Sequence, residues 1–171
     1  MPARPNSRPN TTRRVRLKGF DYRTPGFYFI TICQQDRSHL FARIAAGHKV
    51  DTPAGMMLSQ AANEINQKFA NTKVDSSVVM PDHVHLLFGL NLDDSVKSQD
   101  SVIDVVGWWK TITTKRYIEG VKQCGWPRFD GKLWQEGYHD RIVRDQRELD
   151  YIRYYIERNP DRWEDDLFHD R

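Results

Sequence analysis

The feature that most constrains the fold of this chain is a run of β-branched and aromatic residues interrupted by a Pro-Asp turn, at residues 78–88. Two apolar stretches joined by such a turn predict a β-hairpin. Successive side chains on a strand point to opposite faces, so the second strand has one apolar face and one face with two histidines. The apolar face, which we expect to be core, carries Val84, Leu86 and Phe88, and the other carries His83 and His85.

Two imidazoles on one face of a strand admit two interpretations. They lie close enough together to bind one divalent cation. Alternatively, they are two surface histidines that happen to alternate with apolar residues. The spacing of His83 and His85 alone favours the second interpretation.

The hydrophobic periodicity predicts an α+β fold. The order of elements is strand, helix, strand, strand, helix, strand and helix, and its first six members match the βαββαβ, ferredoxin-like pattern. In that fold two helices cover one sheet face, so the histidine face is open for the final helix. The sequence also predicts a loop with at most one short strand at 34–53 and turns at 120–131. The expected strands are 26–33, the hairpin strands and 139–144, and the expected helices are 57–71, 101–118 and 146–159.

The final predicted helix carries Tyr151, Tyr155 and Asn159 at intervals of four residues, and therefore on one face. If this helix crosses the open sheet face, Tyr155 and Asn159 approach the two histidines. Asn159 then supplies an oxygen as a third metal ligand, and Tyr155 places its hydroxyl near a metal-bound phosphate. A phenol with a pKa of about 10 is a weak nucleophile, which a divalent metal offsets. Ordinary packing is the alternative for Tyr155.

Length and charge distribution predict one folded domain with two charged ends. The chain has 171 residues and a formal net charge of +3, too small to indicate a nucleic-acid partner by itself. We expect a basic, flexible arm at 1–18, a domain at 19–160 and an acidic tail at 161–171. The arm contains Arg13, Arg14 and Arg16, which either follow a DNA phosphate backbone or are simply solvated.

Other features of the composition exclude several classes of protein. Cys33 and Cys124 are far apart and lack CxxC spacing, which argues against a structural zinc site and a disulfide scaffold. No stretch approaches the roughly 18 apolar residues of a membrane span, and the N-terminus has no apolar signal region. A cytoplasmic location is expected.

A candidate surface for single-stranded DNA combines cations with aromatic rings, on which bases stack while phosphates pair with the cations. Trp109 falls on the apolar stripe of its helix and is expected to be core instead. The candidate DNA-binding residues outside the arm are Trp108, Lys115, Arg116 and Trp126.

Four motifs in order along the chain resemble the single-tyrosine HUH transposases, and most closely the REP-associated tyrosine transposases, which are relatives of the insertion-sequence-200 type. The resemblance covers residues 20–160. The motifs are Tyr22-Arg23-Thr24-Pro25-Gly26-Phe27-Tyr28-Phe29-Ile30-Thr31-Ile32-Cys33, Met80-Pro81-Asp82-His83-Val84-His85-Leu86-Leu87, Leu133-Trp134-Gln135-Glu136-Gly137-Tyr138-His139-Asp140 and Tyr155-Ile156-Glu157-Arg158-Asn159-Pro160.

This resemblance implies a function and assigns roles to site residues. It implies that His83 and His85 are the HUH metal ligands, Asn159 the third ligand and Tyr155 the nucleophile. It further implies Mg²⁺ or Mn²⁺, cleavage of single-stranded DNA near hairpins, a 5′-phosphotyrosine intermediate and a free 3′-hydroxyl. Such a DNA-nicking and rejoining enzyme is expected to associate with the nucleoid.

Several alternatives remain open at this point. Ligand chemistry alone also allows Zn²⁺ at a two-imidazole site. Tyr154 is a neighbouring competitor, although it points about 100° away from Tyr155 on a helix. Arg141 replaces a histidine common in relatives, which leaves the role of residues 138–141 undefined. The chain is either a monomer or a homodimer, and a domesticated, non-catalytic hairpin-binding protein is the alternative function.

Overall fold

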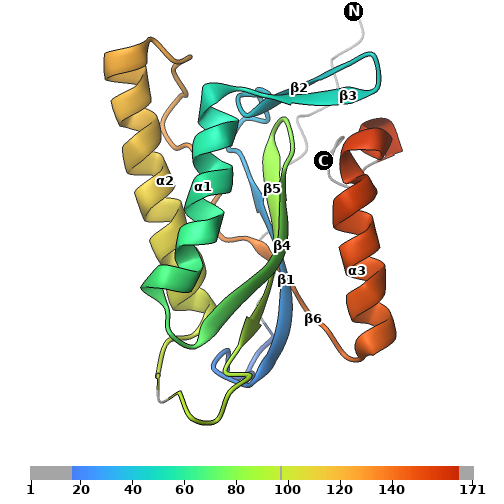
Figure 1. Cartoon of the computed structure of the whole chain (residues 1–171). Coiled ribbons are helices and arrows are strands. Elements are labelled where there is room, and N and C mark those ends of the chain that lie inside the picture. The colour runs from blue at the N-terminus through green and yellow to red at the C-terminus, as the bar shows by residue number, and fades with distance from the viewer. Residues whose placement is uncertain (1–16, 97, 166–171) are drawn as a thin grey trace, which may run out of the picture.

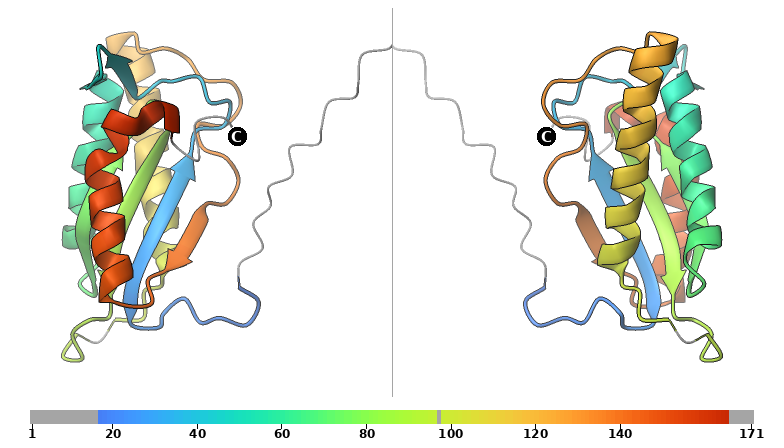
Figure 2. Two further views of the ribbon diagram at one scale, coloured as in Figure 1. Left: turned by 90° about the vertical axis from the view of Figure 1, so that its right-hand side faces the viewer. Right: turned by 90° about the vertical axis from the view of Figure 1, so that its left-hand side faces the viewer.

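The computed structural model describes residues 17–96 and 98–165, which form a four-stranded antiparallel sheet covered on both faces by helices (Figure 1). Helices α1 and α2 lie on one face and α3 on the other, as both views in Figure 2 show. The predicted ferredoxin-like α+β fold with an added C-terminal helix is therefore confirmed. The sheet order is β4-β5-β1-β6, with β1 at Gly26–Cys33, β4 at Thr72–Val79, β5 at His83–Leu90 and β6 at His139–Ile142. The helices are α1 at Pro53–Lys68, α2 at Val102–Cys124 and α3 at Gln146–Arg158.

Strand β5 is buried over its whole length, and its two faces belong to different cores. Leu86 and Phe88 join the larger apolar cluster, which includes residues of α1 and α2. Leu87 joins a smaller cluster with Ile152 and Ile156 of α3. The alternation inferred from the sequence is therefore correct, and α3 docks on the histidine face.

Each helix begins at a capping residue that the sequence supplies. Ser101 and Asp104 form the expected capping box of α2. Asp145 accepts a hydrogen bond from the Glu148 backbone N–H at the start of α3. Helix α1 begins at Pro53, four residues earlier than predicted, because Thr52 caps it and proline suits the first turn.

Helix α2 ends at Cys124, six residues later than predicted. The sequence pattern suggests that Gly120 starts a turn, but this residue lies inside the helix under Trp126. A Cβ atom at Gly120 would lie 2.2 Å from the Trp126 ring, so close packing explains this glycine. The stop signal is Gly125, whose left-handed φ of 67° caps the helix.

The predicted loop at 34–53 contains two short strands rather than at most one. β2 (Ala42–Ala45) and β3 (His48–Asp51) form a hairpin. Its turn residues Ala46 and Gly47 both have positive φ, as this tight turn requires. Alanine rarely adopts that conformation, so the sequence carries no recognisable turn signal here.

Two sets of ion pairs hold α3 against the sheet. Arg153 of α3 donates to Asp75, which lies at the register shift of β4, and this contact keeps the pKa of Asp75 below its usual value. At the start of α3, Glu148 accepts a hydrogen bond from the Arg144 backbone N–H and pairs with Arg141. These contacts keep the pKa of Glu148 low.

Cys33 is buried and Cys124 is exposed, and within the described residues neither forms a disulfide bond. None of the helices within residues 17–96 and 98–165 has both the length and the apolar character that crossing a membrane requires. Most of the basic arm and the end of the acidic tail, at 1–16 and 166–171, lie outside the described residues.

Candidate active site

His83 and His85 lie side by side at the start of β5 and are fully buried. Their Nε2 atoms face each other across 3.1 Å. The sheet register places them opposite Cys33 and Thr31 of β1. The structure therefore brings the two imidazoles together as a metal site requires, and the interpretation as separate surface histidines is wrong.

The other ring nitrogen of each histidine is engaged by a neighbour. His83 Nδ1 lies 2.8 Å from Asp82 Oδ1, and His85 Nδ1 lies 2.8 Å from Thr31 Oγ1. An oxygen that accepts the Nδ1 proton leaves the lone pair on Nε2. The same arrangement orients histidines that bind metals in other proteins.

Asp82 is in turn held by Arg37. The Arg37 Nε atom lies 2.9 Å from Asp82 Oδ2, which is fully buried. Arg37 has a left-handed φ of 60°, a conformation that costs a non-glycine residue on the order of 1 kcal/mol and persists where contacts hold it. Neither residue was predicted from the sequence to belong to the site, although Asp82 directly precedes the first histidine.

Asn159 provides a third polar group on this side of the sheet. Its side chain is 2% exposed, and within the described residues its Oδ1 atom has no hydrogen-bond partner. It lies at the C-terminal end of α3, as predicted. Asn159 lies four residues after Tyr155 and four residues before Trp163. The Tyr155 ring contacts His85, and the Trp163 ring contacts His83. An orphaned buried oxygen bracketed in this way is suited to a cation.

This donor set fits a divalent metal ion. Adjacent ligands of an octahedral ion with bond lengths of about 2.1 Å are separated by about 3.0 Å, close to the 3.1 Å between the two Nε2 atoms. No group of three His, Cys, Asp or Glu side chains suited to a metal occurs in the described chain. The third protein ligand would therefore be the Asn159 amide oxygen.

Tyr155 is the tyrosine that faces the histidines. Its ring centroid lies 5.4 Å from that of His85 and 6.0 Å from that of Phe29, which itself stacks on His85. Tyr154 is 53% exposed, with Arg158 over its ring. Tyr151, one helical turn before Tyr155, is 63% exposed.

Trp163 completes the wall of the site and was not predicted to do so. It lies in the 3₁₀ helix η1 (Asn159–Asp165) that continues from α3. Its ring stacks on His83 with centroids 5.9 Å apart, and His39 contacts its edge. Trp163 lies in the segment predicted as an acidic tail from residue 161, and its side chain is buried.

Residues 138–141 include two side chains with structural roles. Asp140 accepts a hydrogen bond from the Tyr22 hydroxyl, which ties β6 to the segment before β1. Arg141, the departure from the common pattern, pairs with Glu148 at the start of α3. In this chain the arginine helps to position the helix that carries Tyr155.

The candidate DNA-binding residues on α2 and its loop lie in the helical layer, on the other face of the sheet from Tyr155. Trp108 packs against Phe69, and Arg116 forms a bidentate pair with Glu64. Lys115 is exposed, and Trp126 packs on Tyr117. Their contact with DNA stays a prediction. Arg13, Arg14 and Arg16 lie outside the described residues.

The chain is similar to several known proteins over most of its length. Residues 56–159 match the family model described as "Transposase IS200 like". A Haemophilus influenzae protein of uncharacterised function is 30% identical over 167 residues, covering 90% of this chain and 91% of that protein. A second protein of that organism, provisionally named a REP-associated tyrosine transposase, is 25% identical over 147 residues, covering 78% and 72%.

Among solved structures, the chain is similar in fold to a REP-associated tyrosine transposase bound to a REP hairpin. The TM-score is 0.56 and the sequence identity 19%. The match covers 79% of this chain and 66% of that one, just under two thirds of its length.

Proposed function

Because this chain belongs to the IS200-like transposase family, we propose that it nicks single-stranded DNA with Tyr155 and rejoins the broken strand to another end. The observation that carries the proposal is the contact between Tyr155 and His85, the latter paired with His83 across 3.1 Å. The candidate nucleophile and the candidate metal site therefore lie side by side, between α3 and the sheet. This arrangement suits transfer of a phosphoryl group.

The residues His83, His85 and Asn159 would hold Mg²⁺ or Mn²⁺. When bound, such an ion polarises a phosphate and stabilises the charge that develops on its oxygens. The chain itself provides the orientation of this site. Asp82 and Thr31 fix the ring orientation of the two histidines, and burial excludes water from them.

In the proposed step, the Tyr155 oxygen attacks the scissile phosphorus and loses its proton. The bond from phosphorus to the 3′ oxygen breaks, and that oxygen gains a proton to become a free 3′-hydroxyl. The downstream strand stays attached to Tyr155 through its 5′ phosphate. Attack by another 3′-hydroxyl reverses the step, so the phosphodiester energy is conserved and no ATP is needed.

The proposed substrate is single-stranded DNA beside a hairpin. The solved relative was bound to a REP hairpin, and we extend that class of ligand to this chain as part of the proposal. Association with the nucleoid follows from the same proposal.

The polarity of the cut tests this function. Hairpin oligonucleotides taken from DNA flanking the gene would carry a label at either the 5′ or the 3′ end and be incubated with Mn²⁺. We expect the 3′-labelled fragment to become attached to protein and the 5′-labelled fragment to be released with an end that a DNA polymerase extends. Attachment of the 5′-labelled fragment would contradict the proposed chemistry. Tight hairpin binding with no cut in any of these DNAs would favour the non-catalytic hairpin-binding function instead.

A further inference from the structure

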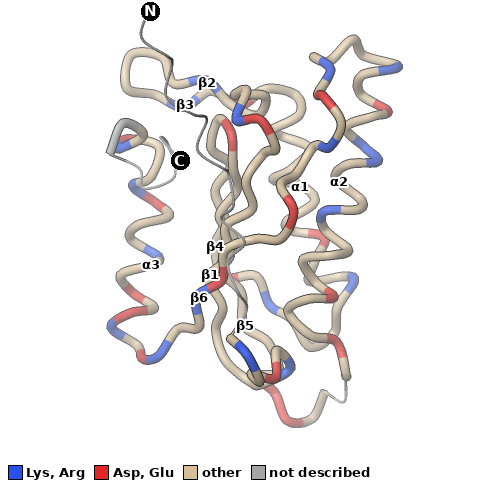
Figure 3. The backbone as a smooth tube through the Cα atoms, turned by 180° about the vertical axis from the view of Figure 1, so that it is seen from behind, with Lys and Arg blue, Asp and Glu red and all other residues tan. Residues whose placement is uncertain are grey.

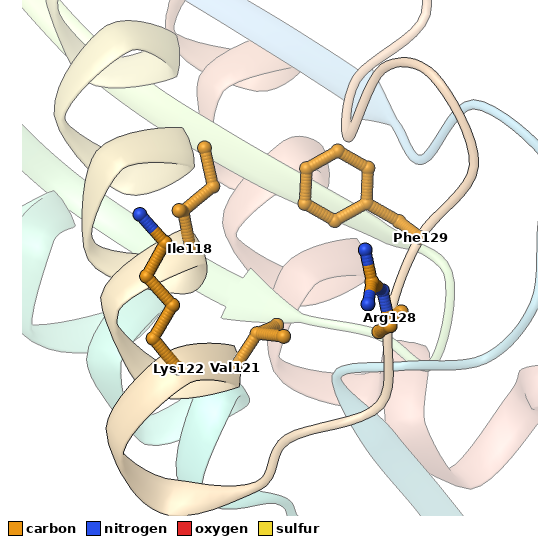
Figure 4. Close-up of a pocket in the computed structure, with 5 residues that line it drawn as sticks. All are labelled: Ile118, Val121, Lys122, Arg128 and Phe129. Carbon is orange, nitrogen blue, oxygen red and sulfur yellow. The ribbon is translucent and has the colours of Figure 1, made fainter.

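A pocket of about 360 Å³ lies between the last turns of α2 and the loop that follows it (Figure 4). Ile118, Val121 and Lys122 line it from the helix, and Arg128 and Phe129 line it from the loop. Figure 4 shows Phe129 facing Ile118 across the opening, with the two cationic side chains beside them. The pocket therefore combines an apolar floor, one aromatic ring and two positive charges.

Contacts behind the pocket hold its loop in place. The Trp126 backbone N–H donates to the Gly120 carbonyl, and the Trp126 ring covers Gly120. The Tyr117 hydroxyl donates to the Pro127 carbonyl across 2.9 Å, and its ring contacts Phe129. These contacts fix the loop on both sides of Arg128, so the pocket is preformed. A preformed site binds with less loss of conformational entropy.

The two cations of the pocket differ from Arg116 and Lys110, two other basic residues of α2. Arg116 is neutralised by Glu64, and Lys110 donates to two backbone carbonyls. Lys122 and Arg128 have no ion-pair partner within the described residues. Figure 3 shows basic positions along α2 and its following loop. None of the described residues that line the pocket carries a carboxylate, so the charge of the pocket favours an anionic ligand.

The pocket lies at the same end of the molecule as the active site. The C-terminal end of α2, the turn between β4 and β5 and the C-terminal end of α3 all lie at the top of Figure 1. The histidines begin β5 at that turn. A single DNA strand that binds at both sites would therefore pass over this end of the sheet.

We propose that this pocket binds one nucleotide of the single-stranded DNA on which the enzyme acts. The proposal rests on the proposed function and adds a second contact for the same substrate. The base lies against Phe129, Ile118 and Val121, and the adjoining phosphates lie at Lys122 and Arg128. The pocket volume falls within the range of about 300–1,000 Å³ of sites for small ligands, and stacking on an aromatic ring accepts any base.

Binding of fluorescein-labelled (dT)10 to the full chain tests the pocket. Phe129→Leu, which removes the ring but keeps an apolar side chain, should weaken binding about fivefold or more. Lys122→Ala should lower the slope of log affinity against log salt by about 0.7, the value for one phosphate contact on a single strand. Lys68→Ala is the matched control, since it removes an equal charge from an exposed site at the far end of α1.

A crosslinking measurement on the unmutated protein tests the same proposal without a substitution that could disturb folding. Substituting 5-iododeoxyuridine in (dT)10 and irradiating the complex should crosslink the peptide that contains residues 118–129. Crosslinks confined to other peptides would contradict the proposal that the pocket binds a nucleotide. The same conclusion would follow if the variants at Phe129 and Lys122 bound (dT)10 as Lys68→Ala does.

The outcomes separate this pocket from the proposed chemistry. Normal DNA binding by the pocket variants, with a covalent adduct on Tyr155 in the unmutated protein, overturns the pocket and leaves the proposed function intact. Weakened binding by the variants, with no adduct in any DNA tested, supports the pocket and contradicts the cleavage mechanism. Failure of the unmutated chain to bind (dT)10 at low salt overturns the pocket, whatever the adduct assay shows.

Discussion

The indole of Trp163 stacks on the imidazole of His83, with ring centroids 5.9 Å apart and planes inclined by 20°. This contact joins the helical turn after α3 to a candidate metal ligand. It makes Trp163 an intrinsic reporter of the site, because the chain has five tryptophans and two of the others, Trp109 and Trp134, are packed together in the main core.

Mn²⁺ is therefore expected to quench the fluorescence of Trp163. Paramagnetic Mn²⁺ bound at His83 would lie next to the indole, and the remaining tryptophans are in the other layer. Trp163→Phe, which keeps a ring against His83, should abolish most of the quenching. Trp126→Phe should retain it. Quenching that survives in Trp163→Phe would place the metal elsewhere.

Asp82→Asn is expected to weaken Mn²⁺ binding by about 10- to 100-fold, the usual effect of losing a carboxylate behind a metal-binding histidine. An amide can donate to Nδ1 of His83, which moves the imidazole proton to Nε2 and blocks the lone pair that faces His85. Isothermal titration calorimetry measures the change. The control is Asp93→Asn, which alters an exposed carboxylate that accepts a hydrogen bond from the Ser95 backbone N–H. This variant should bind Mn²⁺ normally.

Asn159→Asp tests the third ligand. If the amide oxygen binds the metal, an added negative charge should raise Mn²⁺ affinity on the order of tenfold. The same change would lower the melting temperature without metal, because an unpaired carboxylate is buried there. Thermal unfolding with and without Mn²⁺ measures both effects. Equal stabilisation of both proteins by Mn²⁺ would remove Asn159 from the ligand set.

Acid should loosen α3 from the sheet. The pKa values of Asp75 and Glu148 are lowered by hydrogen bonds from Arg153 and from the Arg144 backbone, so both carboxyls ionise more readily in the folded chain. Their stabilising effect is complete above the unfolded pKa of about 4 and is lost as the pH falls through the lower folded value. Urea unfolding between pH 7 and pH 3 should show this loss.

Asp75→Asn should make the stability of the protein less dependent on pH in that range. The comparison is with Asp94→Asn, in an exposed turn, which should leave the pH dependence unchanged. Identical pH profiles for the two variants would show that the Asp75 contact does not hold α3.

The local patterns of the sequence predicted the framework of the site. The alternation around His83 and His85 assigned their shared face, and the spacing from Tyr155 to Asn159 selected the tyrosine that the structure places beside His85. These inferences succeed because side-chain direction in strands and helices follows from backbone geometry.

Contacts between distant segments escaped prediction. Arg37 reaches Asp82 from a loop with a left-handed backbone, and Trp163 reaches His83 after a kink at Arg162 within η1. Neither position has a periodic pattern to mark it. The composition after Pro160 instead suggested an acidic tail, because composition does not reveal one buried tryptophan.

Covalent trapping on Tyr155 tests the central claim most directly. Labelled hairpin oligonucleotides would be incubated with the protein and Mn²⁺, with and without chelator, and resolved on a denaturing gel. We expect a metal-dependent labelled protein band that is lost in Tyr155→Phe and kept in Tyr154→Phe, whose altered ring is exposed. A band that survives in Tyr155→Phe, or that disappears only in Tyr154→Phe, would contradict the assignment of Tyr155 as the nucleophile.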